Sequence, residues 1–152
     1  MIDKLEKLIE RLNGVDLVGY ARQDCIDDEA EFCDRIRYQM EELGVMPDST
    51  PIHRLGYPDS YIYAPRTIAH KIRTGQRIDH VTLRDTGRYH SSITMQNDSD
   101  GMWFVSSDFK AESLRAYYGE TLSLTDDYLN LYITTTLKDN LLSQIKTELL
   151  YG

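Results

Sequence analysis

The feature that most constrains the fold is a regular spacing of apolar residues near the C-terminus. They stand at every fourth position, at Leu129, Ile133, Leu137, Leu141, Ile145 and Leu149. Residues four apart lie on one face of an α-helix, whereas a strand would require alternation. The pattern therefore predicts a long amphipathic helix that opens at Thr125-Asp126-Asp127 and packs through one face on another element. The β-branched run Thr134-Thr135-Thr136 has low helix propensity, so we expect a bend there.

Residues 1–43 form an acidic region in which helices are also predicted. Within residues 1–13, apolar residues recur at three- and four-residue steps, at Ile2, Leu5, Leu8, Ile9 and Leu12. Residues 15–22 fit either a short strand or an extended link. A second helix is predicted from an N-cap at Asp24 to about Leu43. The acidic residues between positions 24 and 34 are interpreted as a solvated helix face, because they lack the alternating oxygen ligands and turn glycine of a calcium loop.

Residues 44–65 contain all four prolines of the chain and are predicted to be a loop. Three tyrosines, Tyr57, Tyr61 and Tyr63, stand within it. Tyrosine provides a large contact area at a low entropic cost and is enriched in protein interfaces. These tyrosines are therefore either candidate interface residues or half-buried residues at the edge of the core.

The remainder of the chain mixes helical and strand signals. Pro65 suits the first turn of a helix over residues 66–74, and Asp85-Thr86-Gly87 marks a turn before a short helical or extended element. Residues 92–107 form the best β-hairpin, with a five-residue connection at 97–101. A further helix is expected from Ser107 or Asp108. These elements predict an α+β fold, with amphipathic helices packed on a small antiparallel sheet.

The predicted organisation is a single domain over residues 1–152. It comprises the acidic helical region 1–43, the Pro/Tyr-rich loop 44–65 and an α+β core at 66–152. A length of 152 residues suits one domain with one modest hydrophobic core. No apolar run approaches the length that a membrane span needs, so no membrane partner is expected.

The net charge of −8 is unevenly distributed along the chain. Residues 1–48 carry 6 basic and 13 acidic side chains, residues 49–90 carry 7 and 3, and residues 91–152 carry 4 and 9. A basic middle between acidic ends is typical of a nucleic-acid patch or of copies that dock head to tail. The overall acidity argues against tight binding to duplex DNA, which depends on many basic contacts with phosphates.

No catalytic or metal-binding motif is recognisable in the sequence. Glycine-rich phosphate loops, histidine pairs at metal-ligand spacing and clustered cysteines are all missing from it. His90 beside Ser91 and Ser92 allows a small-hydrolase hypothesis, but no nucleophile-elbow motif accompanies these residues. The sequence predicts no catalytic residue, no metal, no cofactor and no small-molecule substrate.

One segment carries a more specific signal. Its motif residues are Thr67, Ile68, Lys71, Gly75, Leu83, Thr86, Gly87, Tyr89, Ser92 and Ile93. This series, with a predicted hairpin after it, resembles the tail-completion or head–tail joining (virion morphogenesis) proteins of tailed bacteriophages. The resemblance implies a non-enzymatic structural protein of the virion, assembled in the host bacterial cytoplasm. It also implies a ring built from copies of the chain that contacts neighbouring neck or tail proteins.

The basic stretch 66–88 supplies the candidate interface residues. They are Arg66, Arg73, Arg77, Arg84 and Arg88, joined by Tyr57, Tyr61 and Tyr63. Within a ring, these arginines would face either an acidic neighbouring subunit or the DNA channel, and the net acidity favours the neighbour. The competing hypothesis is a nucleic-acid-binding accessory protein that uses this stretch.

Overall fold

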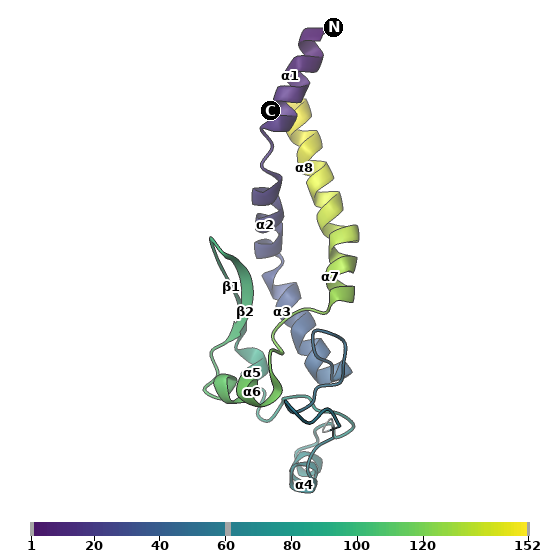
Figure 1. Cartoon of the computed structure of the whole chain (residues 1–152), viewed down its shortest axis with the longest axis vertical. Coiled ribbons are helices and arrows are strands. Elements are labelled where there is room, and N and C mark those ends of the chain that lie inside the picture. Colours follow the sequence, from purple (N-terminus) through teal and green to yellow (C-terminus); the bar gives the residue numbers. More distant parts are fainter. Residues whose placement is uncertain (1, 60–61, 152) are drawn as a thin grey trace. The chain divides into compact units, whose positions relative to one another are not determined.

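The computed structural model describes residues 2–59 and 62–151, without the side chains of residues 2–5 and 8. It confirms the α+β prediction, with a two-stranded antiparallel sheet and a long C-terminal helical segment (Figure 1). The helices are α1 Ile2–Asn13, α2 Leu17–Asp27, α3 Glu29–Tyr38, α4 Pro65–Arg73, α5 Arg88–Ser91, α6 Ala111–Tyr118, α7 Asp126–Tyr132 and α8 Lys138–Tyr151. The π-helical segments are η1 Gln39–Leu43 and η2 Ile133–Leu137, and the strands are β1 Ile93–Asp98 and β2 Gly101–Ser106.

The chain divides into two compact units. Residues 1–28 with 127–152 form the helical unit, and residues 29–126 form the mixed unit. The boundaries predicted from the sequence, near positions 43 and 65, do not coincide with these limits. A single domain over the whole chain stays a prediction.

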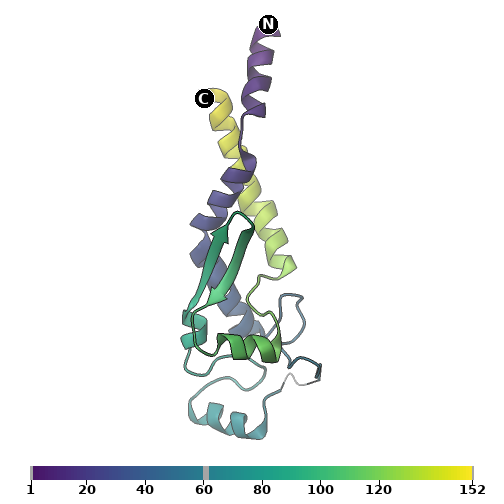
Figure 2. The same ribbon diagram turned by 60° about the vertical axis from the view of Figure 1, so that its left-hand side comes forward.

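In the helical unit, α1 and α2 pack along α8 (Figures 1 and 2). Arg11 Nη1 donates to Leu149 O at 3.0 Å, and Tyr20 OH donates to Glu148 Oε1 at 2.7 Å. At the end of α7, Tyr132 OH donates to Asp28 Oδ2 at 2.8 Å. Tyr132 is the only buried residue among the side chains described in this unit. The helical unit is therefore held together with almost no enclosed apolar core of its own.

The prediction for residues 15–22 was wrong, because this segment opens helix α2. Asp16 is the N-cap, and its Oδ1 accepts a hydrogen bond from the backbone N–H of Gly19 at 2.8 Å. An aspartate cap supplies a partner for an otherwise unpaired amide, which allows the helix to begin at Leu17, seven residues before the expected cap at Asp24.

The threonine run in the C-terminal segment coincides with the π-helical segment η2. Thr134 Oγ1 donates to Asn130 O and Thr135 Oγ1 donates to Leu131 O, each at 2.7 Å. Side-chain hydroxyls that bond to preceding carbonyls compete with the regular helical ladder. The threonine run therefore departs from regular α-helical hydrogen bonding, and the bend predicted there stays a prediction.

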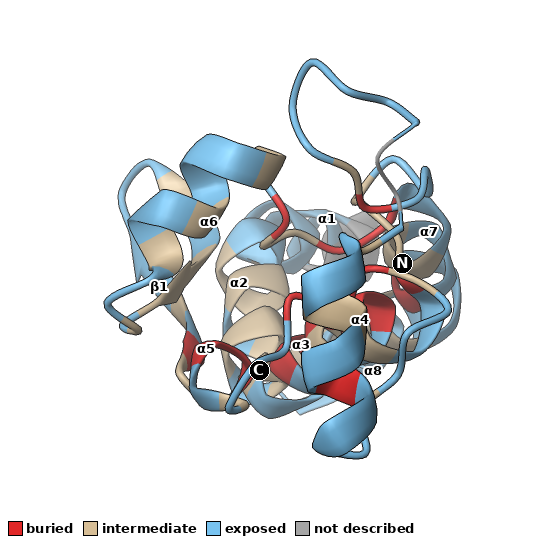
Figure 3. Ribbon diagram, turned by 90° about the horizontal axis from the view of Figure 1, so that it is seen from below, coloured by how far each residue is buried: buried red, intermediate tan, exposed pale blue. Residues whose placement is uncertain are grey.

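The mixed unit contains the hydrophobic core, whose residues are shown in red in Figure 3. Its buried apolar residues are Phe32, Cys33, Ile36, Met40, Ile52, Val81, Leu83, Tyr89, Ile93 and Leu124. Helix α3 supplies the first three of them, and Ile52 joins them from the Pro/Tyr-rich loop. The loop thus packs on the core through an isoleucine.

The predicted hairpin is confirmed with a tighter turn than expected. Pairing runs from Ile93 opposite Ser106 to Asp98 opposite Gly101, so only Ser99 and Asp100 connect the strands. The predicted helix over residues 66–74 is α4. In the described part of the chain, no helix combines the length and apolar character that would be needed to cross a membrane.

Candidate functional site

Lys71 connects helix α4 to the basic loop, which we define as residues 74–87. It is the only buried residue of α4. Its Nζ donates to Arg84 O at 2.6 Å, to Gln76 Oε1 at 2.9 Å and to Thr82 Oγ1 at 3.3 Å. The ring of Tyr63 lies 4.6 Å from the same nitrogen. Three oxygen atoms of the basic loop and the ring of Tyr63 therefore satisfy the buried ammonium group. Because these partners surround one nitrogen, they fix the path of the loop.

Three residues of the predicted motif, Gly75, Leu83 and Gly87, have left-handed backbone conformations. Gly87 has a φ of +86° directly before α5, where glycine carries no steric penalty. Leu83 has a φ of +54°, which is unfavourable for a leucine, and its side chain is buried in the core. Thr86 Oγ1 accepts a hydrogen bond from Arg88 N at 3.5 Å. The buried Leu83 side chain and the hydrogen bond between Arg88 and Thr86 therefore hold the turn in place.

The later motif residues join α5 to the hairpin. Tyr89 is buried, and its hydroxyl lies 3.3 Å from Thr121 Oγ1. Ser92 Oγ donates to Tyr89 O at 3.0 Å and lies 2.6 Å from Ser106 Oγ on β2. Ile93 is buried, whereas the earlier motif residues Thr67 and Ile68 on α4 are half-buried. All these contacts position elements of the mixed unit relative to one another.

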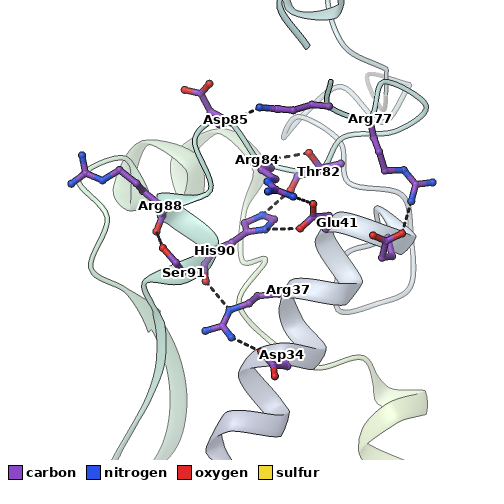
Figure 4. A network of polar contacts seen from close by, with 12 residues as sticks. Asp34, Arg37, Glu41, Arg77, Thr82, Arg84, Asp85, Arg88, His90 and Ser91 are labelled. Carbon is purple, nitrogen blue, oxygen red and sulfur yellow. Dashed lines mark hydrogen bonds and ion pairs between the residues drawn. The ribbon is translucent and has the colours of Figure 1, made fainter. Parts of the chain in front are cut away.

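Most arginines of the basic stretch pair with carboxylates of the chain itself (Figure 4). Arg77 bonds to Glu42 at 2.6 Å and to Asp79 at 2.8 Å, and it holds the pKa of the Asp79 carboxyl well below its usual range. Arg84 pairs with Glu41 on η1. The contact of Arg88 with Asp108 is looser, at 4.0 Å. Much of the positive charge predicted to face a partner is therefore neutralised inside the mixed unit.

Arg66 and Arg73 differ from the other candidate residues. Both are exposed on α4, and the described part of the chain contains no ion-pair partner for either of them. Among the candidate tyrosines, Tyr57 is exposed with its ring 4.9 Å from the Arg54 guanidinium carbon. Tyr63 is half-buried, and its hydroxyl accepts from Thr82 N at 2.6 Å. Tyr61 lies outside the described residues.

His90 is a buried titratable group beside Glu41 and Thr82. Its Nε2 donates to Thr82 O at 2.9 Å, which makes Nδ1 the bare nitrogen of the neutral ring. That Nδ1 is buried without a hydrogen bond in the described structure and lies 3.7 Å from Glu41 Oε2. Ser91 Oγ donates to Arg88 O at 3.1 Å instead of bonding to His90. The serine–histidine pair of the small-hydrolase hypothesis is not formed in this geometry.

We expect the stability of the fold to fall between pH 6.5 and pH 4 because of His90. Burial, assisted by the charges of Arg84, Arg37 and Lys71, lowers the pKa of His90 from 6.5 to about 4, against the opposing effect of its bond to the Thr82 carbonyl. The unfolded chain therefore binds more protons in this range, so stability is full above pH 6.5 and lost as the pH falls. The expected loss is about 2 kcal/mol from pH 7 to pH 5, measured by urea denaturation.

The control for this expectation is His90→Gln, which cannot titrate and keeps a side-chain donor. Its stability should change much less between pH 7 and pH 5. Carboxyl groups with lowered pKa, such as those of Asp79 and Asp85, lose their contribution to stability at a pH below the range from pH 7 to pH 5. Equal pH dependence in the two proteins would show that His90 does not cause the loss.

The surface around this network is hollowed by charged clefts. One cleft of about 270 Å³ is lined by Glu41, Glu42, Thr74, Gly75, Gln76, Arg77, Thr82 and Arg84. Acidic and basic side chains stand on its walls and pair with each other, so no unbalanced charge is presented to a ligand. Within the described residues, no three His, Cys, Asp or Glu side chains gather as a metal site would require.

Sequence reasoning missed the acidic side of the network, namely Glu41 and Glu42 at the end of the first helical region. Their only sequence signal was a pair of adjacent acidic residues far from the basic stretch, which does not specify which charges meet.

Comparisons of the chain with protein-family models, with curated proteins and with solved structures found no match.

Proposed function

We propose that this chain is a structural virion protein of a tailed phage. It takes part in the head–tail (neck) or tail-completion assembly as a ring of its own copies, beside neighbouring neck or tail proteins, and it is made in the host bacterial cytoplasm. The resemblance of residues 64–93 to tail-completion proteins motivates this proposal. The described contacts of the motif residues support it, because they hold the architecture of the mixed unit.

The observation that carries the proposal is the exposed apolar surface of the helical unit. Val18 is 80% exposed, and Leu131, Leu142 and Leu150 are exposed on the C-terminal helical segment. Exposed apolar side chains in such numbers are typical of surfaces that another protein covers. A subunit of a larger particle meets this condition, since its helices become buried when the particle assembles.

Light scattering on the purified protein tests this proposal. We expect a species of several subunits at low and moderate salt. Val18→Asp together with Leu131→Asp should shift the mass towards the monomer, because both substitutions place charge on an apolar surface. Phe109→Asp is the control, as Phe109 is 75% exposed in the mixed unit, and it should leave the mass unchanged.

Two outcomes would contradict the proposal. A wild-type chain that stays monomeric at every concentration would remove the self-assembly that it requires. Retention on duplex DNA with a steep dependence on salt, lost on substitution of Arg66 and Arg73, would instead favour the nucleic-acid-binding accessory role.

A further inference from the structure

Helix α4 presents a basic face to the outside of the mixed unit. Arg66, Ala69 and Arg73 follow one another at the helical spacing of three and four residues, and all three are exposed. Ile72 stands beside them and is 61% exposed. Figure 3 shows most of α4 in the colour of exposed residues. No acidic side chain is present in the helix sequence, so nothing on α4 itself balances these charges.

This face differs from the rest of the basic stretch because its two arginines make no ion pair in the described structure. Arg77 pairs with Glu42, Arg84 pairs with Glu41, and Lys71 is buried on the inner side of α4. Among the arginines of residues 66–88, only Arg66 and Arg73 lack an ion pair in the described structure. Each lies within about one helical turn of an end of α4, and two charges seven positions apart lie about 10 Å apart along a helix axis. An elongated acidic surface therefore suits this face better than a small ligand with a single charge.

Helix α1 has a complementary face. Glu6, Ile9, Glu10 and Asn13 share one side of the helix and are all exposed. Lys7 stands about 100° from Glu6 and three positions before Glu10, but it makes no ion pair with either glutamate in the described structure. Like charges at positions i and i+4 destabilise a helix, and the described residues provide no cation for Glu6 or Glu10.

We propose that the basic face of α4 in one copy docks on the Glu6–Glu10 face of α1 in a neighbouring copy. The two arginines meet the two glutamates, the small side chain of Ala69 allows the helices to approach, and Ile72 and Ile9 make the apolar contact. The surfaces in contact are different on the two copies, so each copy offers one of each and the contact propagates into a ring or a chain. The inference deepens the proposed function, because it names the partner and the residues of the assembly contact.

A protein partner fits this face better than a nucleic acid does. Binding to duplex DNA relies on many phosphate contacts, whereas α4 offers two free arginines on a chain of net charge −8. The acidity that repels DNA is instead an advantage towards a second copy of this chain, since electrostatic complementarity sets the register and the rate of association.

Charge reversal in separate chains tests the contact. The first variant carries Arg66→Glu and Arg73→Glu, and the second carries Glu6→Lys and Glu10→Lys. In each variant alone, like charges oppose each other, so association should weaken by about tenfold or more. In an equimolar mixture, every α4 face again finds an α1 face of opposite charge on the other variant. Sedimentation should then show assemblies of wild-type mass, which only contacts between different chains can restore.

The matched control for the first variant is Lys110→Glu with Arg115→Glu, which makes the same change of net charge at two exposed positions of the mixed unit outside α4. Its assembly should match that of the wild type, and circular dichroism should show that all variants are folded. Reversed variants that assemble like the wild type, or a mixture of folded variants that stays dissociated, would overturn the contact while leaving the proposed structural role intact. A monomeric wild type would overturn both. Unchanged assembly with loss of DNA retention in the first variant would assign the α4 face to phosphates.

Discussion

Replacing Ile36 with alanine is expected to lower the free energy of unfolding by about 3 to 4 kcal/mol. Ile36 has an exposed fraction of 0%, and it lies on α3 between the buried residues Phe32 and Met40. Truncation removes three buried carbons and leaves a cavity that helix backbones can close only in part. Urea denaturation at pH 7, followed by circular dichroism, measures the change.

The matched control is Ile62→Ala in the same unit. Ile62 is 58% exposed, so the same chemical change removes little buried surface and should cost less than about 1 kcal/mol. Similar losses for the two variants would mean that α3 does not form the centre of the hydrophobic core. A large loss of stability for Ile36→Ala alone would support α3 as the centre of the hydrophobic core.

The second large effect is expected for Gly44→Ala, at the end of the π-helical segment η1. Gly44 has a φ of +63°, and an added Cβ would lie 2.2 Å from Cδ2 and 2.9 Å from Cβ of the His80 side chain. His80 cannot move freely, because its Nε2 bonds to Glu41 O at 2.9 Å. The left-handed conformation and the crowding together should cost about 3 kcal/mol, again measured by urea denaturation.

Gly75→Ala separates the two contributions to this loss. Gly75 has nearly the same backbone conformation, with a φ of +67°, but an added Cβ would meet no atom within 4 Å. Only the conformational penalty of about 1 kcal/mol applies there. The difference of about 2 kcal/mol between the variants then measures the crowding against His80. Equal losses would show that the His80 ring can give way.

Much of the fold could be predicted from local signals. The four-residue spacing near the C-terminus, the hairpin around Gly101 and the helix after Pro65 were all found by periodicity and turn chemistry. Such signals depend on neighbours within about five positions, which the sequence displays directly. The segment 15–22 was missed because the capping role of Asp16 was overlooked, although this signal is also local.

The candidate site could be predicted only in part. The sequence pointed to the right segment, since Lys71, Leu83, Gly87, Tyr89 and Ile93 prove to be buried or conformationally special residues of one network. It treated the arginines of that segment as one group, whereas the structure separates them into paired and unpaired residues. Arg84 meets Glu41 across 43 positions and Arg77 meets Glu42 across 35.

Local patterns thus predicted most of the helices, the hairpin and the basic character of residues 66–88, because backbone preference and amphipathic spacing act over short distances. Which of these charges are available to a partner depends on the tertiary structure. Arg77 and Arg84 pair with Glu42 and Glu41 of η1, and Lys71 is buried by residues of the basic loop and by Tyr63. No local pattern encodes which distant carboxylate a guanidinium will reach. The same packing leaves Arg66 and Arg73 on the outer face of α4, where the assembly contact is proposed.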